Sequence, residues 1–369
     1  IYFMQIHNSN YYLKYALKLA KKSKGKTSLN PAVGCVIEKN GKIIGKGFHQ
    51  YFGGPHAEIE AINSLTEPPE NSSMYVTLEP CSHFGKTPPC VDEIIKYKFK
   101  KVIIGMQDVN PLVNGAGITK LKNAGIEVEI NNLNNQINYF YRDFIKFIKT
   151  GQPFIRLKAA ISIDGKIALK NGMSKWITNF SARKFVHKLR NEVDAILIGV
   201  NTLLIDNPEL TVRHIKNSNE NYKIILDTSL KTKLDCNIFK SNKFERIIII
   251  TASNNFDKIN SFKDKGVNII KTEIEKNGLL NLKSVLNDLT KFGIKDILVE
   301  GGSKIFTYFL VNNLVDEFYF FISNKIIGND GLPVFGDLNL SEFEYFLSPI
   351  NIKKFQDNIL IHSCKFSYK

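Results

Sequence analysis

Short apolar segments alternate with amphipathic, helix-like segments along most of this chain of 369 residues. Residues 32–49 contain two apolar runs on either side of Asn40-Gly41, a pair that favours a tight hairpin turn. Strand-like and helix-like segments then follow one another up to residue 130. This order predicts an α/β fold, with a mostly parallel sheet covered by helices on its faces.

The pattern is interrupted at Gly151-Gln152-Pro153, directly after a helix-like stretch at residues 134–150. A second alternation of strands and helices follows, with strand-like segments at residues 154–162, 195–199, 223–227, 246–251, 295–300, 317–324 and 359–366. The length of the chain also fits about two domains. We therefore expect two different α/β domains joined by a short linker. Their expected bounds are residues 4–148 and residues 152–369.

The charge and the cysteine content restrict the class of protein. The net charge is +15, but the sequence has no block of five or more like charges, and its basic residues are not interleaved with stacking aromatic residues. This favours a phosphorylated small molecule over a nucleic acid as ligand. No apolar run approaches the roughly 20 residues needed to span a membrane. Five scattered cysteines argue against a disulfide framework and favour a cytoplasmic protein with reduced thiols.

Four residues form a pattern typical of a catalytic zinc site. His56 and Glu58 lie two positions apart at the start of a helix-like segment, and Cys81 and Cys90 follow in "TLEPCSHFGKTPPC". One imidazole and two thiolates are three protein ligands, which leaves the fourth position of zinc for water. Zinc deaminases use His-x-Glu followed by Pro-Cys-x-x-Cys, and their glutamate moves protons without binding the metal.

The spacing of the two cysteines departs from that pattern. Eight residues separate Cys81 from Cys90 instead of two, so we expect the octet to loop out and line the site. Cys90 would then begin a helix, whose N-terminus favours a thiolate. Zinc lowers the pKa of bound water to about 7, and Glu58 can pass its proton to a departing amine. The residues thus predict hydrolysis of an exocyclic amino group on a heteroaromatic ring.

Simpler or different interpretations remain open. Glu58 also suits the first turn of a helix as an ordinary acidic residue. The cysteines can instead belong to a structural zinc site of a regulatory binding protein, with Cys35 or Cys236 as a fourth ligand. A nucleic-acid deaminase with an accessory domain shares the zinc motif and suits the basic charge.

Longer motifs resemble those of a known family. "NPAVGCVI", "GFHQYFGGPHAE", "YVTLEPCSHFGKTPPC" and "MQDVNPLVNGAG" are similar to the deaminase half of the bifunctional riboflavin-biosynthesis deaminase/reductase family. "LKAAISIDGKIA", "SKWIT", "NTLLIDNPELTVR" and "LVEGGS" resemble its reductase half, in the same order. The resemblance implies a cytidine-deaminase-like three-layer α/β/α domain followed by a dihydrofolate-reductase-like domain. It also implies Zn²⁺ and NADPH as cofactors, and we expect a homo-oligomer.

The resemblance further implies two reactions. The first hydrolyses the 2-amino group of 2,5-diamino-6-(5-phosphoribosylamino)pyrimidin-4-one. The second reduces the ribosyl group of 5-amino-6-(5-phosphoribosylamino)uracil to ribityl with hydride from NADPH. The implied partners are thus phosphorylated pyrimidines, with no nucleic acid and no membrane.

The resemblance also implies individual site residues. The implied substrate contacts of the deaminase are Asn30, His49, His83, Lys86 and Asn110. The implied NADPH contacts are Ala160, Ser174, Trp176, Thr202 and Asp206, and we add Gly301, Gly302 and Ser303 from their place at an expected helix start. The implied contacts to the reductase substrate are Arg190, Leu210, Arg213 and Glu300.

The chemistry of some of these residues supports the assignment. Gly301-Gly302 lies between a strand-like and a helix-like segment, where backbone amides can hold a diphosphate. Arg190 and Arg213 suit phosphate, since a guanidinium binds it through two hydrogen bonds. Lys158 and Glu300 are expected as a polar pair at the reacting carbon, with Lys158 as the catalytic residue. Asn207 departs from the family, whose members often have a second Asp after Asp206.

Overall fold

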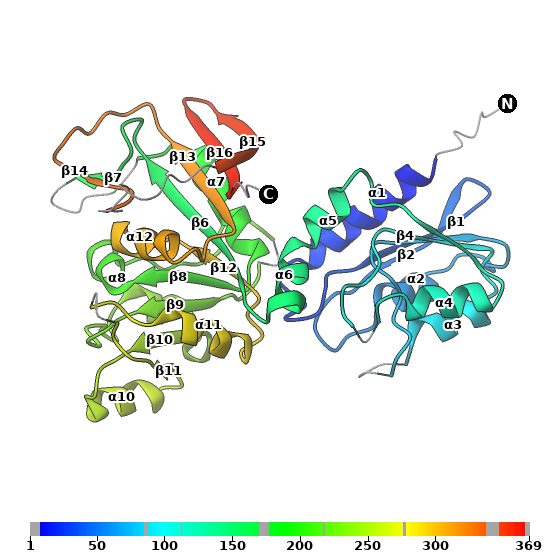
Figure 1. Ribbon diagram of the computed structural model, residues 1–369, viewed down its shortest axis with the longest axis horizontal. Helices are drawn as coiled ribbons and strands as arrows, with labels where there is room; N and C mark the ends of the chain where they lie inside the picture. The colour runs from blue at the N-terminus through cyan, green and yellow to red at the C-terminus, as the bar shows by residue number, and fades with distance from the viewer. Residues whose placement is uncertain are drawn as a thin grey trace. The chain divides into compact units, whose positions relative to one another are not determined.

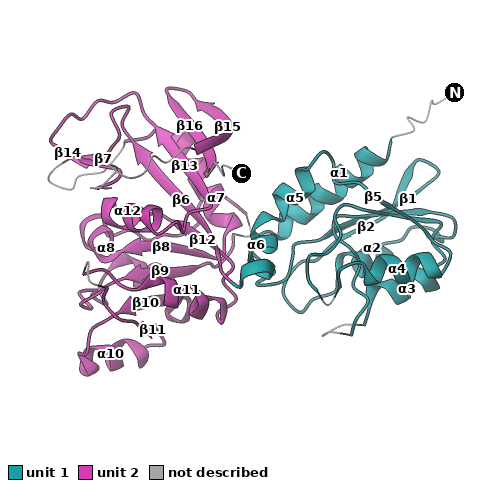
Figure 2. Ribbon diagram, viewed as in Figure 1, with its two compact units in different colours: residues 1–151 teal, residues 152–369 magenta. Residues whose placement is uncertain are grey.

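The computed structural model describes residues 8–84, 88–111, 113–169, 177–216, 218–275, 278–336 and 347–365. The chain divides into two compact units, residues 1–151 and residues 152–369 (Figure 2). None of the helices in the described ranges combines the length and the apolar character needed to cross a membrane.

The first unit is built on a five-stranded sheet with the order β2-β1-β3-β4-β5 (Figure 1). The strands are β1 (Gly34–Lys39), β2 (Lys42–Phe48), β3 (Ser73–Val76), β4 (Lys101–Ile104) and β5 (Glu127–Ile130). The helices are α1 (Ser9–Ala20), α2 (Ala57–Asn63), α3 (Cys90–Lys96), α4 (Ala116–Asn123), α5 (Gln136–Phe140) and α6 (Arg142–Thr150). β1 is antiparallel to β2 and β3, whereas β3, β4 and β5 run parallel.

Local sequence explains both the hairpin and the layers of this unit. Asn40 and Gly41 have φ values of 50° and 81°, the positive values that a tight primed turn requires. Successive residues of β1 point to opposite faces of the sheet. Val36 packs with α1, α5 and α6, while Cys35 and Ile37 pack with α2, α3 and α4. The unit is therefore the expected three-layer α/β/α domain.

The second unit contains a nine-stranded sheet with the order β11-β10-β9-β8-β12-β6-β13-β16-β15. Its strands are β6 (Phe154–Ile161), β8 (Ala195–Gly199), β9 (Tyr222–Leu226), β10 (Ile247–Thr251), β11 (Asn268–Lys271), β12 (Asp296–Val299), β13 (Glu317–Ile322), β15 (Leu347–Phe355) and β16 (Asn358–Lys365). β7 (Lys166–Leu169) and β14 (Gly331–Pro333) form a separate antiparallel pair. The helices are α7 (Phe180–Glu192), α8 (Val200–Asp206), α9 (Asn237–Ser241), α10 (Phe256–Lys263), α11 (Leu282–Thr290) and α12 (Ser303–Val311).

Seven strands of the nine-stranded sheet run parallel, and β16 and β15 add an antiparallel edge. The strongly apolar strands, such as β8 and β10, are the ones that the sequence predicts. The sequence pattern misses β7, β11, β14 and β15. Most residues of β15 are exposed, so this strand lacks the apolar pattern by which buried strands are recognised.

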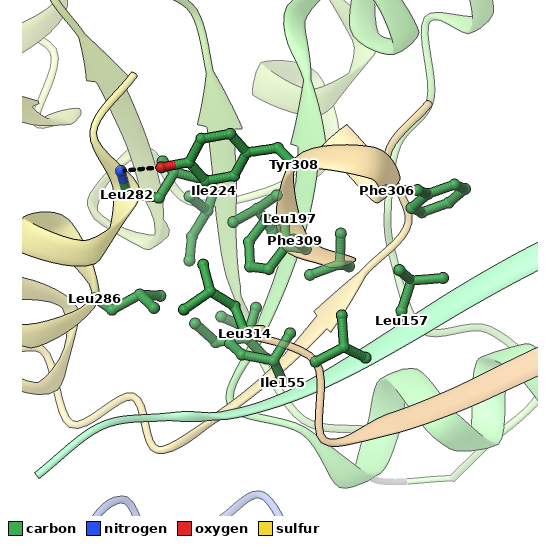
Figure 3. Close-up of a cluster of buried hydrophobic side chains, with 14 of the residues drawn as sticks. Ile155, Leu157, Leu197, Ile224, Leu282, Leu286, Phe306, Tyr308, Phe309 and Leu314 are labelled. Atoms are coloured by element: carbon green, nitrogen blue, oxygen red, sulfur yellow. Dashed lines mark hydrogen bonds between the residues drawn. The ribbon is translucent and has the colours of Figure 1, made fainter. Parts of the chain in front are cut away.

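Helices α11 and α12 pack on one face of this sheet. Figure 3 shows Phe309 and Leu314 with strand residues such as Leu197, and a hydrogen bond from the Leu282 N–H to the Tyr308 hydroxyl oxygen, 3.3 Å long. Burial of these large side chains fixes α12 against the sheet. Only three residues, 300–302, separate the end of β12 from the start of α12.

Candidate functional site

The expected metal ligands meet in the first unit. His56 is the residue before α2, Cys81 follows β3, and Cys90 is the first residue of α3. The His56 Nδ1 atom lies 3.4 Å from the Cys81 Sγ and 3.2 Å from the Cys90 Sγ. All three ligand atoms lie within 4.8 Å of one another. Two helix starts and one strand end thus bring together residues that are far apart in sequence.

The surroundings of Cys81 favour its thiolate. A hydrogen bond from the Cys90 side chain, together with the His56 ring and the Cys90 backbone N–H, lowers the pKa of Cys81 to about 4. The Cys90 N–H donates to the Cys81 Sγ over 3.3 Å. A thiolate is the form in which cysteine binds metal.

The geometry of the three residues fits zinc. In a tetrahedral site with Zn–S near 2.3 Å and Zn–N near 2.1 Å, neighbouring ligand atoms lie roughly 3.5–3.8 Å apart. The two His56–cysteine distances, 3.2 and 3.4 Å, are close to this value. Among the described histidine, cysteine and acidic residues, no fourth ligand joins the cluster. Cys35 is buried in the core of the first unit, and Cys236 lies in the core of the second.

Glu58 lies in the first turn of α2, beside this cluster. Its side chain is buried, and burial raises its pKa to about 7, despite the opposing charge of His56. Glu58 also lines a cavity of about 390 Å³ that includes His56 and Cys81. A carboxyl group with this pKa can accept and release a proton near neutral pH.

Four of the expected substrate contacts line the same cavity, namely Asn30, His49, His83 and Asn110. The fifth, Lys86, lies outside the described residues. The His49 Nδ1 atom is 2.9 Å from the Pro55 carbonyl oxygen, which identifies Nδ1 as the protonated nitrogen. The buried His49 Nε2 has no hydrogen-bond partner among the described residues and is available as an acceptor.

The sequence interpretation missed part of the cavity wall. Phe144, Phe147 and Ile148 of α6 line it, as do Glu79 and Asp108. The spacing of the three α6 residues predicts one apolar face of a helix. It does not show that this face borders a cavity instead of packed side chains.

A second cavity, of about 580 Å³, lies in the second unit. Its lining includes eight of the expected residues: Lys158, Ala160, Thr202, Asp206, Glu300, Gly301, Gly302 and Ser303. Ser174 and Trp176 lie outside the described residues. Arg183, Asn201 and Thr228 also line the cavity and were not expected. Strand ends and helix starts supply most of this lining, as is usual for ligand sites of α/β proteins.

A buried group of charges borders this cavity. Both Glu300 oxygens accept from Arg190, over 2.6 and 3.0 Å, and the Lys158 Nζ lies 3.7 Å from Glu300 Oε2. Burial by itself would raise the pKa of Glu300, but the charges of Arg190 and Lys158 lower it to about 2. Burial lowers the pKa of Lys158, and Glu300 opposes that shift. The three side chains therefore form an ion cluster.

The start of α12 gives this cavity a place for a phosphate group. Gly302 directly precedes α12, and a Cβ built on it would make only an ordinary contact, with the Thr202 hydroxyl oxygen at 3.7 Å. The N–H groups of the first helical turn have no partner within the helix and favour a phosphate. The volume and the glycine-lined helix start together suit the diphosphate of NADPH.

The remaining expected residues lie on neighbouring segments outside the cavity lining. The Arg190 guanidinium faces Glu300 and also donates to the Thr211 carbonyl oxygen, so it is not a free phosphate fork. Leu210 is buried, whereas the Arg213 side chain is 58% exposed. The Arg213 N–H donates to the His187 Nδ1 over 3.1 Å.

Asn207, the departure from the family motif, ends α8 in the left-handed conformation with φ 42°. Asparagine tolerates this conformation better than most residues. Its side-chain oxygen accepts from the Asn237 N–H over 2.8 Å.

Comparisons with known proteins cover both units. A family model described as "Cytidine and deoxycytidylate deaminase zinc-binding region" matches residues 6–106. A model described as "RibD C-terminal domain" matches residues 153–361, more than half of the chain. The two matches follow one another in the order of the two units.

Whole proteins match over nearly their full length. The riboflavin biosynthesis protein RibD of Aquifex aeolicus is 42% identical over 333 residues, which are 90% of this chain and 91% of that protein. RibD of Escherichia coli is 37% identical over 87% of this chain and 89% of its own.

Solved structures agree with these matches. A structure of Acinetobacter baumannii RibD has a TM-score of 0.87 at 32% identity, covering 97% of this chain and 99% of that one. The deaminase/reductase of Thermotoga maritima has a TM-score of 0.83 at 36% identity, with the same coverage. The chain therefore belongs to the RibD family of riboflavin-biosynthesis enzymes, which join a zinc-dependent deaminase to an NADPH-dependent reductase.

Proposed function

We propose that residues 4–148 carry the deamination and residues 152–369 the reduction, with the residue roles given below. The observation that carries the proposal is the buried Glu58 beside a three-ligand cluster with the chemistry of catalytic zinc. The two compact units divide after residue 151, and α6 runs to Thr150. A deaminase fragment should therefore extend to Gly151 to keep this helix complete.

In the deaminase site, His56, Cys81 and Cys90 hold the zinc. When bound, the ion lowers the pKa of water so that hydroxide is available near neutral pH. The water oxygen bonds to the ring carbon that carries the 2-amino group, the bond from this carbon to the amino nitrogen breaks, and ammonia leaves. Glu58 takes the water proton and delivers it to the departing nitrogen.

The other cavity residues of the first unit bind the pyrimidine. Asn30 and Asn110 offer amide donors and acceptors to its edge, and the His49 Nε2 offers an acceptor. His83 lines the site from the loop between the two cysteines. We assign the substrate phosphate to Lys86 by its charge.

In the reductase site, Lys158 is the proton donor and Glu300 holds it in place. NADPH, when bound, supplies the hydride to the sugar carbon C1. The bond from C1 to the ring oxygen opens, and Lys158 donates a proton to that oxygen. Burial lowers the pKa of Lys158, which makes it a better acid.

The other residues of the second unit hold the two ligands. Ala160, Thr202, Asp206 and the segment Gly301–Ser303 contact the cofactor, and Ser174 and Trp176 join them by resemblance. Leu210 and Arg213 contact the ribose phosphate of the substrate, and Arg190 fixes Glu300 at that site.

The substrates are phosphorylated pyrimidines and not nucleic acid, the location is cytoplasmic, and the protein is a homo-oligomer. The scattered basic residues and the two cavities, of about 580 and 390 Å³, support small-molecule substrates. A nucleic-acid deaminase would share the zinc ligands, but that alternative gives no use to the second unit, which matches the RibD C-terminal domain.

The test is the variant Glu58→Gln, assayed with the diaminopyrimidine phosphate by mass analysis of products. We expect the variant to keep one zinc per chain, to lose at least about 100-fold in deamination rate, and to reduce the deaminated intermediate at the normal rate. Near-normal deamination would refute the role of Glu58. A wild-type protein that deaminates a single-stranded cytosine oligonucleotide and not the pyrimidine phosphate would favour the alternative.

A further inference from the structure

Glu79 is a buried acid of the first unit for which the proposed chemistry gives no role. It lies two residues before Cys81, separated from it by Pro80, and only 4% of its surface is exposed. Its backbone N–H donates to the Met106 carbonyl oxygen over 2.9 Å. Glu79 therefore joins the segment between β3 and the proposed ligand Cys81 to the segment that follows β4.

The Glu79 carboxylate accepts three backbone N–H groups from one segment. Its Oε2 accepts from Asp108 over 3.1 Å and from Gly115 over 3.0 Å, and its Oε1 accepts from Ile118 over 3.1 Å. Backbone N–H groups only donate, so both oxygens act as acceptors. Gly115 has no side chain with which to cap α4, and Glu79 supplies this cap from a distant part of the chain.

The clamped segment carries a wall of the deaminase cavity. Asp108, Asn110 and Val113 all line that cavity; Asp108 is the first donor of the clamp, and the other two lie between it and the last donor, Ile118. The packing there leaves no spare room, since a Cβ on Gly117 would lie 2.3 Å from the Pro80 carbonyl oxygen. The segment thus rests directly on the two residues that precede Cys81.

We propose that Glu79 is a positioning residue for deamination, which fixes Asn110 relative to the metal ligand Cys81. The inference rests on the proposed roles of Asn110 and Cys81 and adds that Glu79 sets the position of one relative to the other. A pyrimidine bound to Asn110 must present one ring carbon to the metal. An error of about 1 Å in that placement can cost about 100-fold in rate.

The test begins with Glu79→Gln, which keeps the size of the side chain. Whichever way the amide is oriented, its NH₂ group faces at least one backbone N–H, so the clamp loses at least one bond. We expect kcat/KM for deamination to fall about 10- to 100-fold, with zinc content and reductase rate unchanged. A purely structural role would instead lower the Tm and leave kcat and KM of the folded protein unaltered, which would overturn the proposal.

Glu38→Gln is the matched control. Glu38 also accepts a backbone N–H, from Gly41 over 2.6 Å, but it lies in the β1–β2 hairpin and does not line the cavity. It should leave deamination unchanged. Glu79→Asp keeps the charge on a shorter side chain and should show the same defect; it replaces Glu79→Gln if that variant does not fold.

A double-mutant cycle with Asn110→Ala separates this inference from the proposed function. If Glu79 acts through Asn110, Glu79→Gln should cost less than about threefold in the Asn110→Ala background, because coupled residues are not additive. Full additivity would overturn the positioning role and leave Asn110 in the site. If the Asn110→Ala variant had the KM of the wild type, Asn110 would not bind the substrate, and Glu79 could not act through it.

Discussion

Glu58 and Glu300 are both buried carboxylates that line a cavity, one in each unit, and their surroundings differ. Glu58 adjoins an imidazole and two thiols, and burial raises its pKa to about 7. Glu300 lies against Arg190 and Lys158, and these two cations outweigh burial and lower its pKa to about 2. The first site is poised to exchange protons, whereas the second holds a fixed negative charge.

The two sites are also held together in different ways. In the first site the proposed metal ligands come from a short sequence motif, and two of them lie at helix starts. The second site depends on an internal ion cluster, in which each charge needs the others to remain buried. A substitution in the first site should therefore lower activity with little loss of stability, whereas a substitution in the ion cluster should lower both.

The largest effect is expected for Glu300→Gln, which leaves Arg190 and Lys158 without their carboxylate. Removing one partner of a buried ion pair costs about 3–5 kcal/mol, and we expect reduction to fall at least about 100-fold while deamination persists. Chemical denaturation and the two separate assays check this result. Glu58→Gln is the paired variant and should change the free energy of unfolding by less than about 1 kcal/mol. Equal losses of stability in both variants would remove the contrast.

A second buried lysine sharpens the comparison with Lys158. Lys223 is 2% exposed, and its ammonium donates to the Asn221 carbonyl oxygen instead of a carboxylate. Burial, with Arg190 and Arg246 nearby, lowers its pKa to about 7. The unfolded chain therefore holds a proton between pH 7 and 10.5 that the folded chain lacks, so stability should rise with pH across that window.

Lys223→Met removes this protonation cost. At pH 6 the variant should be more stable than wild type by a few kcal/mol, at about 1.4 kcal/mol per unit of pKa difference. This gain should shrink as the pH approaches 10. Thermal unfolding across pH measures the effect, with the exposed Lys243→Met as control. A gain independent of pH would mean that Lys223 is not neutralised by folding.

The smallest effect is expected for Arg213→Ala. The Arg213 guanidinium is exposed and lies 3.4 Å from Glu209, so its loss leaves no buried charge unpaired. We expect the KM for the phosphoribosyl substrate to rise about 10- to 100-fold, the effect of one charge-assisted hydrogen bond, with the KM for NADPH unchanged. Initial rates at varied concentrations of each ligand test this. An equal rise in both KM values would place Arg213 at the cofactor.

Most of the architecture follows from local sequence patterns. Buried strands such as β8 and β10 are continuous apolar runs, and Asn40-Gly41 sets the hairpin turn. The exposed strand β15 escapes this reasoning because solvent imposes no apolar pattern on it. The sequence also predicts one helix-like stretch at residues 134–150, whereas the structure has two helices, α5 and α6, divided at Tyr141. No glycine or proline marks this division.

The sequence alone predicts the proposed metal ligands and the proposed proton-transferring acid, because a coordinating set of this kind needs particular residue types at particular helix starts. It also determined the two α/β units, through the alternation of strands and helices. Only the tertiary structure decided that Arg190 pairs with Glu300 and that Glu79 clamps the segment of Asn110. Hydrogen bonds and ion pairs between distant residues depend on distances of a few ångströms, which the packing of the strands and helices sets and no local pattern encodes.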